Sequence, residues 1–248
     1  MQRQLRFLLM FMGAMILSLS AWAQKKDCYV IDPRDTQVVG ESLTADRDGN
    51  LTLVMGGGQS VTYKKGQYKS AHIPKPKEVV TLEQAMEQKK TDYVLKEAPA
   101  IFAKYQYLGW GGHTAALEGQ AQLEKSNYQA ALQCFDRSLG MKDQEPAEAL
   151  TGKVMALIGL KRNPEALALV EKLVAAADDK TAPYAFNARG QLLASEGKKR
   201  EAVLEYLKTL LLFKPEEAVA ERAAARKAVV ALLKEMGDPR AAEFEKIP

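Results

Sequence analysis

The amino-acid sequence predicts a mainly α-helical chain, a solenoid of helical hairpins preceded by a small five-stranded β-domain. Two observations predict this division. Between about Cys28 and Ile73, short runs rich in Val, Thr, Tyr and Leu alternate with glycine-bearing turns, as β-strands do. Beyond Glu78 the apolar residues recur with a period of about 3.6, and the helix-favouring residues Ala, Leu, Glu, Lys and Gln dominate.

The N-terminal residues have the layout of a secretory signal peptide. Two arginines precede an apolar run, residues 7–19, and the small residues Ala21 and Ala23 precede the expected cut. A retained membrane anchor is the alternative, but the run is shorter than the roughly 20 residues that span a bilayer. Gln24 follows the cut where a lipoprotein would have cysteine. We expect residues 1–23 to be removed and the remainder to be periplasmic or secreted, without a membrane span.

Charge and composition argue against a polyanionic partner. The formal net charge is +4 for the whole chain and about +2 once the two arginines of the leader are removed. Acidic and basic residues are nearly balanced and form no block of one sign, so we expect no nucleic-acid partner.

The chain has two cysteines, Cys28 and Cys134, and two histidines. In an oxidising compartment the cysteines could form a disulfide, and the alternative is a pair of small buried thiols. Cysteine and histidine are too few and too scattered for a local structural zinc site. We therefore expect no metal and no cofactor.

The β-domain is expected to span residues 24–73. Strands are predicted at 28–32, 37–45, 50–55, 60–64 and 68–73. Asp48-Gly49 suits a tight hairpin turn, and the glycine run 56–58 is read as another turn, not a phosphate loop, because no Gly-Lys-Ser/Thr ending follows. Strands this short must curl to bury a face, so we expect a small SH3-like or Sm-like barrel or sandwich.

A proline- and lysine-containing linker, residues 74–80, follows the β-domain, because Pro74 and Pro76 cannot continue a strand. Residues 81–113 are expected to form a helical lead-in, one or two helices with a proline inside, which we interpret as a degenerate repeat. It is closed by the segment 109–112, whose tryptophan either packs in the core or contacts a ligand.

The remaining residues, 114–248, repeat a pattern in which a small residue is followed four positions later by a bulky one. Ala131, Ala166 and Ala202 begin this pattern at intervals of 35 and 36 residues. The predicted units are about 114–145, 146–181, 182–215 and 216–248. Three or more stacked hairpins bury a continuous core that one hairpin cannot, whereas an irregular all-α bundle is the alternative.

These residues resemble the tetratricopeptide repeat family. The resemblance is carried by helix-A glycines, turn glycines, helix-B alanines and aromatics, and a closing proline: Gly119, Tyr128, Ala131, Phe135, Ala166, Gly190, Gly197, Ala202, Tyr206 and Pro215. The third unit matches best and the second keeps little beyond its alanine. The resemblance implies an α-solenoid with a concave face.

The resemblance also implies that protein partners bind helix-A side chains on the concave face. In this sequence the candidate positions are Gln120, Thr151, Met155, Tyr184, Asn187 and Gln191, together with His113, Ala116 and Glu148. The lysine and asparagine set with which some members clamp a terminal carboxylate is absent, since Ala116 and Gln120 stand where it would begin. An extended segment or a folded partner is therefore expected.

No catalytic constellation is evident. His72 borders the linker and His113 begins the first clear repeat, so neither lies next to a recognisable nucleophile in the sequence. We expect a non-enzymatic adaptor or scaffold in the bacterial envelope. The alternatives are a structural envelope component whose β-domain docks cell wall or an outer-membrane complex, and a hydrolase with a histidine in an interdomain site.

Overall fold

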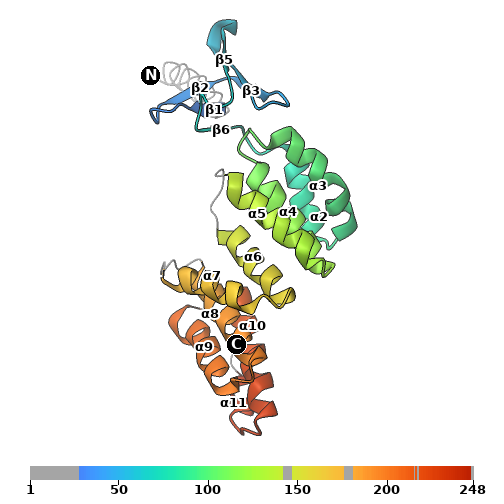
Figure 1. Cartoon of the computed structure of the whole chain (residues 1–248), viewed down its shortest axis with the longest axis vertical. Coiled ribbons are helices and arrows are strands. Elements are labelled where there is room, and N and C mark those ends of the chain that lie inside the picture. The colour runs from blue at the N-terminus through green and yellow to red at the C-terminus, as the bar shows by residue number, and fades with distance from the viewer. Residues whose placement is uncertain (1–27, 142–146, 176–180, 215, 217, 247–248) are drawn as a thin grey trace, which may run out of the picture. The chain divides into compact units, whose positions relative to one another are not determined.

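The computed structural model describes residues 28–141, 147–175, 181–214, 216 and 218–246 (Figure 1). The predicted signal peptide, residues 1–23, and the repeat-closing Pro215 lie outside these residues. The chain divides into two compact units. The first holds the chain up to Lys77 together with Lys104–Trp110, and the second holds the rest.

The first unit is a β-rich domain. Its strands are β1 (Cys28–Ile31), β2 (Gln37–Gly40), β3 (Ser42–Ala45), β4 (Leu51–Val54), β5 (Ser60–Tyr63) and β6 (Ser70–His72). They form two antiparallel three-stranded sheets, one ordered β2-β1-β6 and the other β3-β4-β5. The predicted small β-domain is therefore confirmed, with six strands among the described residues where the sequence predicts five.

The extra strand arises because the predicted strand 37–45 is divided at Gly40. β2 ends there and β3 begins two residues later, in the other sheet. The amide of Glu41 donates to the carbonyl of Val54 at 2.7 Å, and a Cβ at position 40 would stand 2.5 Å from Cδ1 of Leu53. Only glycine allows the chain to pass this close to β4 and change sheets. A residue pattern that reads as one strand does not show such a bend.

The two central strands supply the core of this unit. Val30 in β1 and Leu51 and Leu53 in β4 are fully buried, and their neighbours along each strand are partly exposed. This alternation places one face of each sheet inward, as expected for short strands that curl around a core. The narrower SH3-like or Sm-like description remains a prediction.

The predicted hairpin turn at Asp48-Gly49 connects β3 and β4. Gly49 has a φ of +87°, which favours glycine. The Asp46 carboxylate accepts hydrogen bonds from the amides of Asp48 and Asn50 at 2.9 and 2.8 Å, so this loop is fixed by local bonds. The next connection, the glycine run, forms a single 3₁₀ turn, η1 (Gly56–Gly58).

The second unit is a series of helices. They are α2 (Lys77–Glu87), α3 (Thr91–Tyr105), α4 (Gly111–Glu124), α5 (Tyr128–Met141), α6 (Ala147–Gly159), α7 (Asn163–Ala175), α8 (Ala182–Ser195), α9 (Lys199–Leu212), α10 (Val219–Glu235) and α11 (Ala241–Phe244). The lead-in is two helices, with Pro99 inside α3. Gly111 and Gly112, expected in a closing loop, form the first turn of α4. In the described part of the chain no helix is both long and apolar enough to cross a membrane.

The lead-in hairpin α2–α3 and the four hairpins after it, which we number first to fourth from α4–α5, turn through the same backbone motif. At each turn one amide bonds three residues back and the next bonds five residues back, which is the Schellman arrangement. The left-handed residues are Lys89, Ser126, Lys161, Gly197 and Gly237. Only the last two are glycines, so the sequence marks the third and fourth turns and not the earlier ones.

Each hairpin is packed around its second-helix alanine. Ala131, Ala166 and Ala202 are fully buried. In the first and third hairpins an aromatic ring lies against a first-helix glycine. A Cβ at Gly119 would stand 2.8 Å from Phe135, and one at Gly190 would stand 2.9 Å from Tyr206.

The second hairpin solves the same packing problem differently. The position equivalent to the glycines is Val154, and the position equivalent to the aromatics is Val170. Both valines are fully buried in one core cluster. Two medium-sized side chains stand here in place of an aromatic ring and a glycine, which has no side chain. This explains why the second unit keeps so little of the family pattern.

Candidate protein-binding face

The first helices of successive hairpins form one continuous side of the second unit. α6 contacts both α4 and α8, and α8 contacts α10, whereas the second helices α5, α7 and α9 make no comparable contacts with one another in the described part of the chain. Helices that lie closer together form the inner side of a curved stack. The first-helix side is therefore the candidate binding face.

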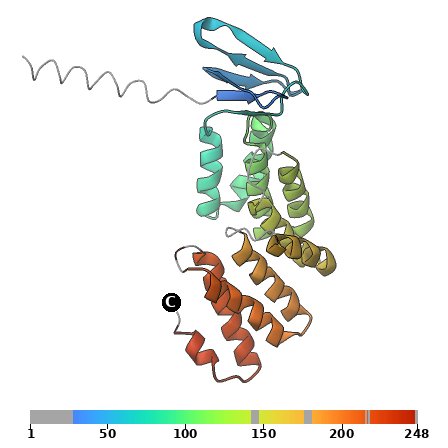
Figure 2. The ribbon, with the colours of Figure 1, turned by 90° about the vertical axis from the view of Figure 1, so that its left-hand side faces the viewer.

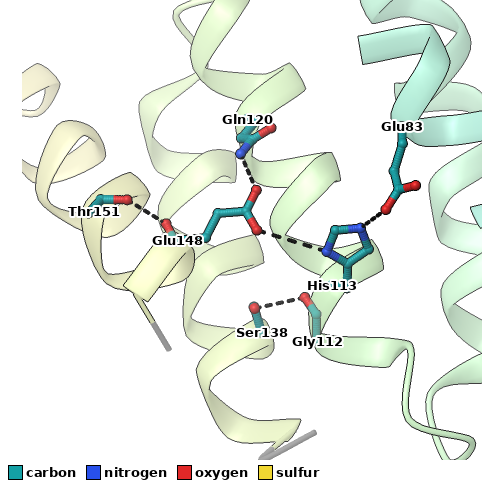
Figure 3. Close-up of polar contacts among 7 residues, drawn as sticks. All are labelled: Glu83, Gly112, His113, Gln120, Ser138, Glu148 and Thr151. Atoms are coloured by element: carbon teal, nitrogen blue, oxygen red, sulfur yellow. Dashed lines mark hydrogen bonds and ion pairs between the residues drawn. The ribbon is translucent and has the colours of Figure 1, made fainter. Parts of the chain in front are cut away.

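A polar cluster connects three first helices at one end of this face (Figure 3). Nε2 of His113 in α4 lies 2.7 Å from Oε1 of Glu83 in α2, and Nδ1 lies 3.9 Å from Oε2 of Glu148 in α6. Glu148 also accepts a hydrogen bond from Nε2 of Gln120 at 2.5 Å.

The cluster is reachable from solvent. The His113 side chain is 22% exposed and those of Glu83 and Glu148 are 25% and 40% exposed. Its chemistry is that of two carboxylates held around one imidazole. Among the described residues no group of histidine, cysteine and acidic side chains is arranged to hold a metal ion.

Two of the predicted contact residues tie neighbouring hairpins together. The hydroxyl of Tyr184 donates to the carbonyl of Thr151 at 2.6 Å, and burial raises the pKa of this tyrosine. Nδ2 of Asn187 donates to the carbonyl of Glu221 at 2.8 Å, and its Oδ1 accepts from Thr209 at 2.9 Å. The polar atoms of Tyr184 and Asn187 are therefore engaged within the stack.

Two other predicted residues lie at a small pocket. Met155 is 50% exposed and Gln191 is also exposed. They border a pocket of about 210 Å³ whose remaining wall includes Leu123, Tyr128 and Ile158. The lining is mostly apolar and includes one side-chain amide, that of Gln191, which is the composition expected of a site for a single apolar side chain.

The remaining predicted residues are Gln120, which belongs to the His113 cluster, and Thr151, whose hydroxyl donates to the carbonyl of Glu148 at 2.8 Å. The sequence analysis missed Glu83, and with it the surroundings of His113. Glu83, His113 and Glu148 belong to three hairpins and follow no fixed spacing, so no sequence pattern joins them.

The second histidine belongs to the β unit. His72 stacks with Tyr29 at 5.2 Å between ring centroids and lies 5.7 Å from the ring of Trp110. Trp110 donates from Nε1 to the carbonyl of Ile73 at 2.9 Å, and Lys75 lies over its ring. Trp110 therefore packs on the β unit, with one part of its surface accessible.

Cys28 and Cys134 are both buried and neither forms a disulfide. Burial, with a further contribution from Glu118, raises the pKa of the Cys134 thiol to about 12. Cys134 is therefore a neutral thiol at physiological pH and a weak nucleophile.

No protein-family model and no curated protein sequence matches the chain. Several solved structures do match the chain. Repeats of a putative kinesin light chain from Podospora anserina align with a TM-score of 0.50 at 11% identity, covering 68% of this chain and 90% of that one. MamA from Desulfovibrio magneticus RS-1 gives 0.48 at 18% identity over 68% and 89%. YrrB, a TPR protein with an unusual peptide-binding site, gives 0.43 at 15% identity over 67% and 80%.

At these identities the likeness concerns the fold alone. The kinesin light chain comparison and the five hairpins of this chain indicate the same fold. The chain has a tetratricopeptide-type fold, as the resemblance in its sequence implies.

Proposed function

We propose that this tetratricopeptide-type chain is an exported, non-enzymatic adaptor that binds a protein partner on the side formed by α4, α6 and α8. The observation that carries the proposal is the exposed Met155 beside a small apolar pocket. A large apolar side chain half exposed on the inner side of a helical stack contributes nothing to the repeat core. Methionine adapts to varied apolar partners, which suits a recognition surface.

The chemistry of the face suggests the kind of segment that it binds. The pocket suits one apolar side chain, and the amide of Gln191 at its edge can bond to an extended backbone. At the other end of the face two carboxylates surround His113. The carboxylate of Glu148, whose side chain is 40% exposed, favours a basic side chain of the partner there.

The proposed location in the envelope rests on the N-terminal sequence. A charged start, an apolar run and small residues at the expected cut are typical of a signal peptide. Fractionation of cells that express the tagged chain tests it. Recovery of an uncleaved product in the cytoplasm would contradict export without bearing on the binding face.

Site-specific photo-crosslinking tests the binding face. A photoreactive amino acid is placed at Met155 or at Gln191, and the matched control carries it at Gln133, an exposed residue of α5 on the outer side. We expect a discrete adduct from the first two positions and none from the control. Equal adducts from all three positions, or none from any, would remove the proposal.

A second candidate is a structural envelope component in which the β unit docks a cell-wall polymer or an outer-membrane complex. The stack of Tyr29, His72 and Trp110 favours it, because partly exposed aromatic rings bind sugars and peptides well. Co-sedimentation with purified wall material tests it. Binding that Tyr29→Ala weakens and Met155→Ala leaves unchanged would support this second candidate over the first.

A further inference from the structure

The outer side of the third hairpin carries a row of three leucines, one of which packs against the repeat core while two are exposed. Leu204, Leu207 and Leu211 lie on one face of α9, at spacings of three and four residues. Leu204 is 60% exposed and Leu211 is 76% exposed, whereas Leu207 is partly buried. We call this row the leucine stripe.

The other hairpins show that the stripe is not a requirement of stacking. α5, α7 and α9 each begin three residues before their buried alanine, so their positions correspond one to one. At the positions equivalent to the stripe the other helices carry short or polar residues, all of them exposed: Gln133, Asp136 and Gly140 in α5, and Ala168, Glu171 and Ala175 in α7. The stripe is therefore particular to α9.

A groove of about 730 Å³ opens beside the stripe. The groove is lined by Leu204 and Leu207 of α9, Leu233 of α10, Met236 just after α10, and Phe244 of α11. The second helices α3, α5, α7 and α9 have 13 to 15 residues, whereas α11 has four (Figure 2). Beyond that single turn, no helix in the described part of the chain covers the groove. A largely apolar groove next to exposed leucines suits an amphipathic α-helix.

The charges at the groove favour an acidic occupant. Two arginines line the groove, Arg200 one turn before Leu204 and Arg240, and both charges act on the carboxylate of Asp238. The one acidic residue in the lining, Asp238, is already held by Arg240, from Nη2 to Oδ2 at 2.6 Å.

We propose that the groove between α9 and α11 binds an amphipathic helix of another protein, with leucine-type side chains on one face and Asp or Glu beside them. The leucine stripe contacts the apolar face, and Arg200 and Arg240 contact the flanking carboxylates. This site is on the second-helix side and is separate from the adaptor face proposed above. It gives the chain two independent binding surfaces.

Fluorescence anisotropy with two synthetic helical probes tests the site on the full chain. Both peptides carry leucines at i, i+3 and i+7, one with glutamates and the other with lysines on the flanks. We expect the glutamate peptide to bind roughly tenfold or more tightly than the lysine peptide, which corresponds to about 1.4 kcal/mol. The double variant Leu204→Gln with Leu211→Gln should weaken it by roughly the same factor, and Arg200→Gln should reduce the preference for glutamate.

Leu212→Gln is the matched control, because Leu212 is 67% exposed on the same helix but lies outside the stripe. It should leave binding unchanged, and circular dichroism should show that all variants keep their helices. Equal binding of the two peptides, no binding of either, or an equal loss in the control would overturn the proposal. So would a dimer, or co-sedimentation with anionic lipid vesicles, that the double variant abolishes.

Discussion

The backbone of Gly152 in α6 lies directly against the ring of Phe135 in α5, so that a Cβ at position 152 would overlap the ring. Phe135 is fully buried, and its ring also lies against Gly119 of its own hairpin. The ring is therefore enclosed by two glycines from successive hairpins and links the first repeat to the second.

We expect Gly152→Ala to destabilise the protein, because overpacking a closed core costs about 1–3 kcal/mol and exceeds what alanine gains as a helix former. Gly140→Ala is the matched control, since Gly140 lies on α5 with open space around it. That change should raise stability by up to about 1 kcal/mol. Urea denaturation measures both, and equal effects would contradict the packing argument.

Substitutions at two hairpin turns are expected to change the free energy of unfolding in opposite directions. Lys161 has a φ of +59° at a position where the third hairpin has Gly197 with a φ of +80°. A left-handed conformation costs a side-chain-bearing residue about 1–2 kcal/mol, partly offset by the greater freedom of glycine in the unfolded chain. Lys161→Gly should therefore raise the free energy of unfolding by about 0.5 kcal/mol or more, and Gly197→Ala should lower it by about 1 kcal/mol. A shift of the same sign in both would argue against the Schellman geometry.

His113 and Glu83 are expected to be energetically coupled across α2 and α4. A double-mutant cycle with His113→Ala and Glu83→Ala should give a coupling free energy of about 1 kcal/mol, since the pair is partly buried and makes one hydrogen bond. A matching cycle that pairs His113 with Glu97, which bonds to Lys96 in α3, provides the control. Additive single effects for His113 and Glu83 would show that their contact does not stabilise the fold.

Asp238 predicts a pH dependence confined to acid conditions. The guanidinium of Arg240 lowers the pKa of this carboxyl from 3.8 to about 2. Because the pKa is lower in the folded state, the ionised carboxylate stabilises the fold at every pH above its pKa in the unfolded chain. This contribution is lost as the pH falls from about 4 toward 2. The stability difference between the wild type and Asp238→Asn should therefore shrink over that interval. A difference that stays constant down to pH 2 would contradict the ion pair.

Cys134 is expected to resist alkylation in the folded protein. Its thiol is buried and its pKa is raised to about 12, so little thiolate is present near pH 8. Mass spectrometry after iodoacetamide treatment should show modification of Cys134 only in denaturant. Rapid labelling of the native chain would show that α5 opens readily.

The sequence predicts the helical hairpins well because their period and their small, buried second-helix residues are local properties. Ala131, Ala166 and Ala202 are enough to place α5, α7 and α9 in the same register. The sheet change at Gly40 was missed because it depends on how closely β4 approaches, which no local pattern records. The turns between α4 and α5 and between α6 and α7 carry no glycine signal in the sequence. Their left-handed residues are Ser126 and Lys161, in a conformation that glycine usually adopts.

The candidate site was harder to predict for the same physical reason. Met155 and Gln191 could be placed from the helix-A register, and they do meet at one pocket. Tyr184 and Asn187 share that register, yet their polar atoms bond to backbone carbonyls of neighbouring hairpins. Whether such a side chain faces a partner or the next repeat depends on the spacing of the helices. That spacing is a property of the folded stack.

The valines of the second hairpin indicate that the repeats keep the volume between their two helices nearly constant. Val154 and Val170 occupy together about the space that a glycine and an aromatic ring share in the neighbouring hairpins, so the two helices divide a fixed volume in different ways. A larger side chain at one of these positions therefore needs a smaller side chain at the other. An aromatic residue at 170 requires a glycine at 154. Neither change alone leaves a well-packed hairpin, so we expect such positions to change together.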